Sequence, residues 1–366
     1  MLRTPDKTVT FTFDFDDPDL KKLEDKVKAV RDNLSAVVLH RNNLWLGGDE
    51  GTSIHRLTSD NGNFGKHVSF DLRKLLLLPI DDPKEEIDFE GLDINEGKLW
   101  FVGSHSAKRE KPKDGKTFAD NLQRITTPKI KGNRFILGRT TLRPKGTDFE
   151  PDTAACLQAS ADDNELTRAL AADPLFSGFV PRPSGKAIPS KDNGLDLEGL
   201  AVSGARVFVG MRGPVLRGWA TILELHVSEA GPKLLKLSPL APSGALFRRQ
   251  FLDLRGLGIR DLAIDEKDLL ILAGPTMVLD GPVLLYRWKN ALDRTEESFV
   301  PEQDLIREFS LPCGNEADKT ETKDHAEGVT LVKGPPKALL VCYDSPSERR
   351  ISGAKRLTVS ADIFSF

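Results

Sequence analysis

Five short stretches decide the fold: Ser35–Asp49 (SAVVLHRNNLWLGGD), Glu90–Ser104 (EGLDINEGKLWFVGS), Glu198–Met211 (EGLAVSGARVFVGM), Arg260–Pro275 (RDLAIDEKDLLILAGP) and Glu327–Asp344 (EGVTLVKGPPKALLVCYD). Each stretch has a short apolar strand, a polar turn and a second apolar strand, which is the pattern of a β-hairpin. Further β-rich runs follow most of them. Antiparallel units repeated along a chain predict an all-β fold of the β-propeller type.

The spacing of the hairpins predicts five blades, with six as the alternative. The interval between the hairpins that start at residues 90 and 198 is much longer than the others, so it holds either a sixth unit or insertions. We favour insertions, at about 106–132 and 144–193, with a small helical insertion around 152–176 whose one or two helices stop before Pro174. The prediction is therefore a single propeller domain over residues 1–366.

The two ends of the chain contain strand patterns with no hairpin partner. Val9–Phe15 (VTFTFDF) alternates near the N-terminus, and Leu357–Phe366 (LTVSADIFSF) ends the chain. Pairing them would close the ring and remove an exposed sheet edge.

Composition excludes several classes of partner. The 366 residues contain 52 Lys and Arg against 55 Asp and Glu, so the net charge of −3 gives no field for general nucleic-acid binding. No apolar run approaches the roughly 20 residues needed to span a bilayer. We expect a cytoplasmic monomer that binds neither nucleic acid nor membrane.

Polar residues, four of them charged, recur at one position of the hairpin repeat, two residues before the aligned apolar residue of the first strand: Ser35, Glu90, Glu198, Arg260 and Glu327. Two residues earlier, on the same side of an extended chain, lie Asp88, Asp196 and His325. In a propeller the first strands line the central channel, so these side chains should meet at its mouth. Asp88, Glu90, Asp196, Glu198 and Glu327 are therefore candidate ligands of a hard cation such as Ca²⁺. The alternative is that each carboxylate caps backbone amides of its own blade.

Other residue types at the same face suggest what else is bound. Arg109, Arg212, Arg217 and Arg260 are candidates for holding an anionic ligand, with solvated loop arginines as the alternative. His105 and His325 are candidate catalytic acids or bases. The sequence has no zinc-protease, P-loop, dinucleotide-binding or G-x-S-x-G motif.

Longer strings carry a family resemblance. DFEGL (88–92), DLEGLAVSGARVFVGMRGPVLRGWA (196–220) and DHAEGVTL (324–331) resemble the bacterial family catalogued as domain of unknown function 3616. Their E-G-L pattern is in turn similar to that of phytase-like and esterase-like propellers, which implies a site at the channel mouth, often with calcium. Ser35 and Arg260 depart from that pattern.

These observations leave several functions open. The favoured hypothesis is a propeller that binds a small anionic ligand at the channel mouth, with Ca²⁺ as the candidate cofactor. The alternatives are a calcium-dependent phosphoester hydrolase, a lactonase-like esterase, and a scaffold for a protein partner. The sequence does not decide whether the protein is an enzyme.

Overall fold

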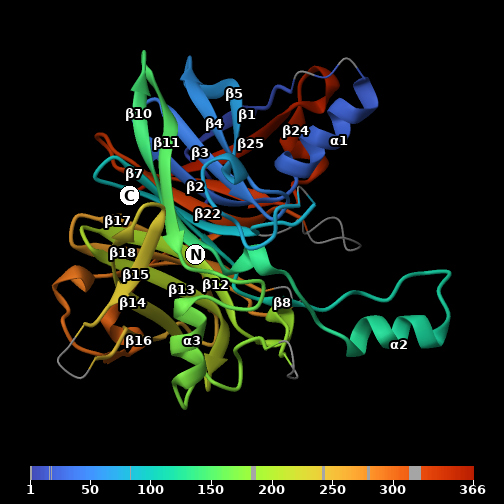
Figure 1. The fold of residues 1–366 in the computed structure, drawn as a ribbon. Helices are drawn as coiled ribbons and strands as arrows, with labels where there is room; N and C mark the ends of the chain where they lie inside the picture. Colours follow the sequence, from blue (N-terminus) through green and yellow to red (C-terminus); the bar gives the residue numbers. More distant parts are fainter. Residues whose placement is uncertain are drawn as a thin grey trace.

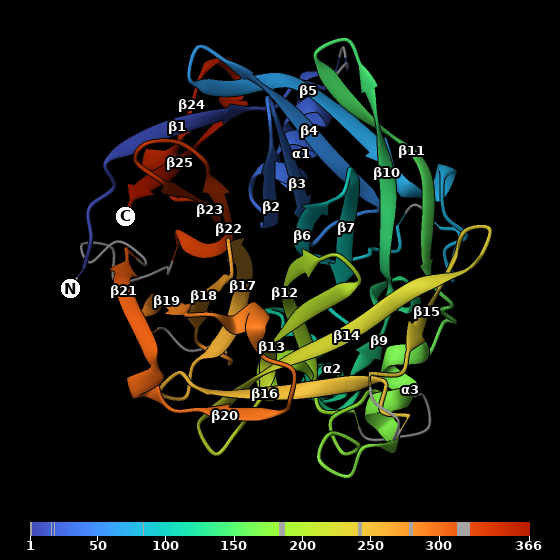
Figure 2. The ribbon, with the colours of Figure 1, turned by 90° about the vertical axis from the view of Figure 1, so that its left-hand side faces the viewer.

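The protein is an all-β ring of antiparallel strands with a β-propeller-like arrangement (Figures 1 and 2). The structure is a computed structural model that describes residues 2–15, 17, 19–82, 84–182, 187–240, 244–277, 281–312 and 323–366. Among these residues, no helix is both long and apolar enough to cross a membrane.

The strands of the ring form five antiparallel runs. The first run is β2 (Leu34–His40), β3 (Asn43–Gly48), β4 (Ser53–Asp60) and β5 (Asn63–Asp71). The second is β6 (Phe89–Asn95), β7 (Lys98–Gly103), β10 (Leu137–Lys145) and β11 (Asp148–Leu157). The third is β12 (Asp196–Ser203), β13 (Arg206–Leu216) and β14 (Trp219–Gly231), whose outer edge pairs with both β15 (Leu234–Ser238) and β16 (Phe247–Asp253). The fourth is β17 (Gly258–Asp265), β18 (Asp268–Gly274), β19 (Val283–Trp288) and β21 (Leu305–Leu311). The fifth is β22 (His325–Val332), β23 (Ala338–Asp344), β25 (Thr358–Ser365) and β1 (Lys7–Thr12), with β24 (Ile351–Ser352) beside β25.

Short parallel contacts link neighbouring runs at their outer edges. β1 pairs with β5, and β11 pairs with β15, so hydrogen bonding joins the runs into a 9-stranded, a 10-stranded and a 4-stranded sheet. β20 (Ser298–Val300) adds to β16 in the same way. At the centre, the first strands β2, β6, β12, β17 and β22 each contact the next, and β22 returns to contact β2.

The predicted closure by the two ends of the chain is confirmed. β1 pairs with β25 in antiparallel register from Lys7 opposite Ile363 to Thr12 opposite Thr358. Val9, Phe11 and Phe13 are buried in the core that this pairing covers. The N-terminal strand therefore completes a run whose other strands come from the C-terminus.

The hydrophobic core lies between neighbouring runs. One cluster joins Trp45 of the first run to Phe89 and Phe101 of the second, and comparable clusters fill the other interfaces. Both faces of each run are covered. The two strands of each hairpin are therefore apolar along their length, and they do not alternate between apolar and polar residues. Helix α1 (Leu20–Arg31) packs Leu23 and Val27 into the cluster that contains β1.

The helical insertion is smaller than the sequence suggested. Residues 152–157 belong to strand β11, so they are part of the second run, and only Glu165–Ala172 form helix α3. The helix begins there because Asn164 and Thr167 form a capping box. Residues 183–186 of the expected 144–193 insertion lie outside the described residues.

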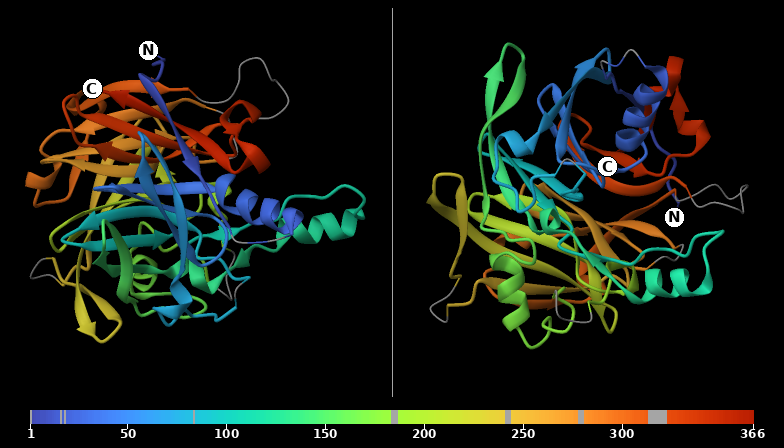
Figure 3. Two further views of the ribbon diagram at one scale, coloured as in Figure 1. Left: turned by 90° about the horizontal axis from the view of Figure 1, so that it is seen from above. Right: turned by 45° about the vertical axis from the view of Figure 1, so that its right-hand side comes forward.

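The segment expected as a 106–132 insertion contains β8 (Ala107–Lys108), α2 (Phe118–Thr126) and β9 (Lys129–Ile130). Helix α2 extends away from the ring beyond its strands (Figures 1 and 3). β8 and β9 pair at the base of this arm and return the chain to β10.

Candidate functional site

Every first strand contains a β-bulge at the same place, and the bulged residue is the one singled out by the sequence repeat. In the first run, Leu34 pairs with Gly48 and Ala36 with Gly47, which leaves Ser35 without an opposite residue. The same break in register occurs at Glu90, Glu198, Arg260 and Glu327. A bulge turns a side chain out of the sheet pattern. All five side chains line one cavity at the end of the ring.

The glycine after the bulge allows the first strands to approach one another. A Cβ atom at Gly91 would lie 2.7 Å from Cβ of Leu200, and one at Gly199 would lie 2.7 Å from Cα of Asp261. Gly199 also has a φ of 83°, which favours glycine. In the fourth run Asp261 replaces the glycine, and its carboxylate accepts hydrogen bonds from the backbone N–H groups of Leu262 and Val329.

The cavity has a volume of about 670 Å³, which is in the range of small-molecule sites. Strand ends from all five runs and the insertion that contains α2 contribute to its lining. The part formed by the ring is mainly acidic, and the part formed by the insertion is mainly basic.

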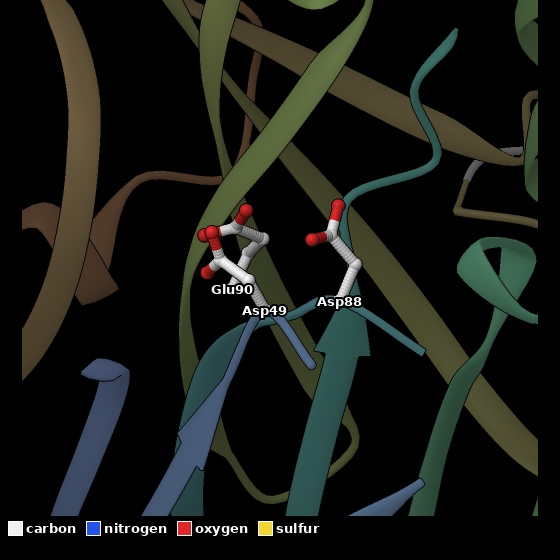
Figure 4. A group of neighbouring side chains, drawn as sticks. All are labelled: Asp49, Asp88 and Glu90. Atoms are coloured by element: carbon white, nitrogen blue, oxygen red, sulfur yellow. The ribbon is translucent and has the colours of Figure 1, made fainter. Parts of the chain in front are cut away.

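Asp49, Asp88 and Glu90 form an acidic cluster on the first and second runs (Figure 4). One carboxylate oxygen from each lies within 4.8 Å of the others. Burial, and then the neighbouring carboxylates, raise the pKa of Asp49 and of Glu90 well above the usual range. Asp49 accepts a hydrogen bond from Ser35, but no described residue donates one to Glu90. Asp88 has a φ of 61°, a strained conformation that holds its carboxylate at the cavity.

Glu198 and Glu327 instead face guanidinium groups and form an arginine wall with Arg212 and Arg260. Arg212 Nη1 lies 2.9 Å from Glu198 Oε1, and Arg260 pairs with Glu327 and lies 3.6 Å from Glu198 Oε2. Burial alone would raise the pKa of Glu327, but Arg260 and Arg212 outweigh it, so that pKa is below the usual range. Glu198 Oε2 is buried without a hydrogen-bond donor among the described residues.

The ring part of the cavity carries more carboxylates than cations. Arg134 compensates Asp88, 3.1 Å away, and contacts Glu86 behind it. Three guanidinium groups (Arg134, Arg212 and Arg260) therefore face seven carboxylates, which are Asp49, Asp88, Glu90, Asp196, Glu198, Glu327 and Asp344. Burial, followed by Glu327, raises the pKa of Asp344 to about 6. Closely spaced carboxylates in a buried site favour a bound cation.

Most of the residues predicted from the sequence meet in this cavity. The candidate metal ligands Asp88, Glu90, Asp196, Glu198 and Glu327, the arginines Arg109, Arg212 and Arg260, and His325 all line it. The candidate ligands are nevertheless divided: Asp88 and Glu90 belong to the acidic cluster, Glu198 and Glu327 belong to the arginine wall, and Asp196 lies 3.6 Å from Arg212.

Two predicted residues lie elsewhere. His105 is fully buried, with Nδ1 2.7 Å from the Gly103 carbonyl oxygen and Nε2 2.7 Å from the Asn164 amide nitrogen. Burial lowers its pKa to about 4. Arg217 is exposed at the turn between β13 and β14 and does not line the cavity. Neither residue lines the cavity.

Three residues of the site were missed by the sequence reasoning. Asp49 directly follows the second strand β3, and Asp344 ends the second strand β23, so both lie at the same edge as the bulges. In an antiparallel run the start of the first strand and the end of the second strand lie at the same edge, so the sequence did contain a signal for these two residues. Arg134 precedes β10 and carried no such signal.

The fold and the cavity define a β-propeller-like protein with a charged site at one end of the ring. The chain belongs to the family described as "Protein of unknown function (DUF3616)", whose model matches residues 33–362. Among curated proteins, none matches the chain.

Solved structures are similar over most of their length but only distantly. The alignment with Myxococcus xanthus glutaminyl cyclase covers 99% of this chain and 97% of that protein, with 8% sequence identity and a TM-score of 0.43. The alignment with the PQQ-bound aldose sugar dehydrogenase of Streptomyces coelicolor covers 99% of this chain and 100% of that protein, with 11% sequence identity and a TM-score of 0.36.

Proposed function

We propose that the cavity binds a small anionic ligand through a divalent cation held by Asp49, Asp88 and Glu90. The observation that carries the proposal is this partly buried acidic cluster, in which Glu90 has no hydrogen-bond donor among the described residues. A hard cation such as Ca²⁺ takes six to eight oxygen ligands, so three carboxylates leave positions for water or a ligand oxygen. The residues present therefore fit such an ion.

The arginine wall supports the anionic character of the ligand. Arg212 and Arg260 are paired with Glu198 and Glu327, but their Nε groups remain buried without an acceptor among the described residues. A phosphoryl or carboxyl group on the cation would place negative charge beside these guanidinium groups. Together, a cation and its anionic ligand would balance the charge of the ring part of the cavity.

A second candidate function is cation-dependent hydrolysis of a phosphoester. The observation that favours it is Asp344, a cavity carboxyl whose pKa of about 6 suits proton transfer near neutral pH. A cation held by Asp49, Asp88 and Glu90 would supply Lewis-acid polarisation of the phosphoryl group. Asp344 would accept a proton from the attacking water.

Several further expectations belong to the proposal. We infer that the five antiparallel runs are five blades of one domain, because their five first strands contact one another in a closed ring. The insertions would then leave the blades unchanged. A cytoplasmic monomer that binds neither nucleic acid nor membrane remains a prediction from composition.

Titration with Ca²⁺, Mg²⁺ and Mn²⁺, followed by thermal unfolding and calorimetry, tests the cation site. A cation that binds the folded state raises the free energy of unfolding by RT ln(1 + [L]/Kd). Asp49→Asn and Glu90→Gln should abolish this response, whereas Glu110→Gln, at a cavity carboxylate outside the acidic cluster, should keep it. A wild-type protein that shows no response to millimolar concentrations of all three ions would refute the proposal.

Hydrolysis is tested separately with a phosphoester panel and a chelator. Cation-dependent phosphate release that is absent in Glu90→Gln and in Asp344→Asn would support the second candidate. Phosphate binding by calorimetry without any release would leave ligand binding as the function.

A further inference from the structure

The cavity has a second charged part, opposite in sign to the acidic cluster. The insertion that contains β8 and α2 contributes Lys108, Arg109, Lys111 and Arg124, and the 3₁₀ helix Ser190–Asp192 contributes Lys191. We call these five residues the basic rim. The only carboxylate that the described residues of these two segments add to the lining is Glu110. Lys108, Lys111 and Lys191 lie outside the sequence repeat, because none of them is on a blade strand.

The rim is a braced structure. Arg109 Nη2 lies 2.7 Å from Asp192 Oδ2, which ties the insertion to the segment before β12. Arg124 of helix α2 lies 3.3 Å from Glu110, and its Nε donates to the Lys111 carbonyl oxygen at 2.7 Å. The two arginines are thus used to position the segments that carry the lysines.

The three lysines have no such partner. Lys108, Lys111 and Lys191 are exposed, and no described carboxylate lies within ion-pair distance of any of them. Each ammonium group offers three hydrogen-bond donors and a full charge to whatever occupies the cavity. If the ligand had a single anionic group and that group were held on the cation, the lysine ammonium groups would donate hydrogen bonds only to water.

We propose that the basic rim is a second anion subsite, so that the ligand is a small molecule with two separated anionic groups, as in a sugar bisphosphate. One group would bind the cation of the acidic cluster and the arginine wall, and the other would bind Lys108, Lys111 and Lys191. This inference rests on the proposed function, because the first group needs the cation site. The cavity volume of 670 Å³ is large enough for a ligand of that class.

Calorimetry with three probes tests the inference: inorganic phosphate, fructose 6-phosphate and fructose 1,6-bisphosphate, each with saturating divalent cation. The wild-type protein should bind the bisphosphate about ten-fold or more tightly than the monophosphate, the usual scale for one added charge-assisted contact. The double variant Lys108→Gln/Lys111→Gln should lose most of that preference and keep its affinity for inorganic phosphate.

The matched control is Lys113→Gln/Lys116→Gln, which removes the same charge from the same insertion at positions that do not line the cavity. The control should bind all three probes as the wild type does. Equal wild-type affinity for the mono- and bisphosphate would overturn the inference and leave the proposed function standing. An equal loss of affinity for all three probes in the rim variant would also overturn the inference, because it would show that the lysines act only by general electrostatic attraction. A wild type that binds none of the probes would overturn both.

Discussion

Replacing Asp344 with asparagine is expected to stabilise the protein when no cation is bound. Asp344 ends strand β23 and faces the carboxylates of the cavity. Burial and then Glu327 raise its pKa to about 6, above the value of roughly 3.9 for an unfolded chain. A carboxyl whose pKa is raised by folding stabilises the folded state below the unfolded pKa, and this contribution is lost as the pH rises through 6.

The size of the effect follows from that difference in pKa. Two pKa units at about 1.36 kcal/mol each correspond to roughly 2–3 kcal/mol of destabilisation at pH 8. Asparagine is neutral and can still accept the hydrogen bond that the Ser345 hydroxyl donates to Asp344 at 3.1 Å. We therefore expect Asp344→Asn to raise the free energy of unfolding by about 1–3 kcal/mol at pH 8 and to lose most of that gain by pH 4.

Urea unfolding at pH 8 and pH 4, in the presence of a chelator, measures this difference. The control is Asp362→Asn, because the Asp362 carboxylate is buried but accepts hydrogen bonds from Arg350 at 2.9 Å and from the Tyr343 hydroxyl at 2.8 Å. That variant should be less stable than the wild type at pH 8. If Asp344→Asn is also less stable at pH 8, the cavity does not hold excess negative charge and the reasoning for a cation site fails.

Three further predictions concern the ring and its site. Gly91→Ala should lower the free energy of unfolding by roughly 1–3 kcal/mol, because the new Cβ would lie 2.7 Å from Cβ of Leu200. Gly65→Ala, where a Cβ would meet no atom within 4 Å, should lower it far less. Chemical unfolding of both variants checks this. Deletion of residues 1–16 removes β1 and should cost several kcal/mol, so an unchanged melting temperature would contradict closure by this strand. His105→Ala should lower the melting temperature by leaving the Gly103 carbonyl without its partner, and a large loss of phosphate affinity at unchanged stability would instead argue for a role in binding.

Much of the fold was predictable because it depends on local patterns that repeat. The five hairpins and the pairing of Val9–Phe15 with the C-terminal strand follow from apolar runs and turns read along the chain, whereas the bulges were not predicted. The extent of the helical insertion was wrong, because residues 152–157 pair with β10 and this long-range pairing overrides their local pattern.

The sequence by itself determined which residue of each first strand reaches the cavity, because a bulge recurs with the repeat. Only the tertiary structure decided what each of these residues faces. Glu90 meets Asp49 of the neighbouring run beside Asp88 of its own, whereas Glu327 meets Arg260. Distances between different runs are set by closure of the ring and by the close approach of the first strands, and neither appears in the spacing of residues along the chain. The separation into an acidic cluster, an arginine wall and a basic rim is therefore a property of the folded protein alone.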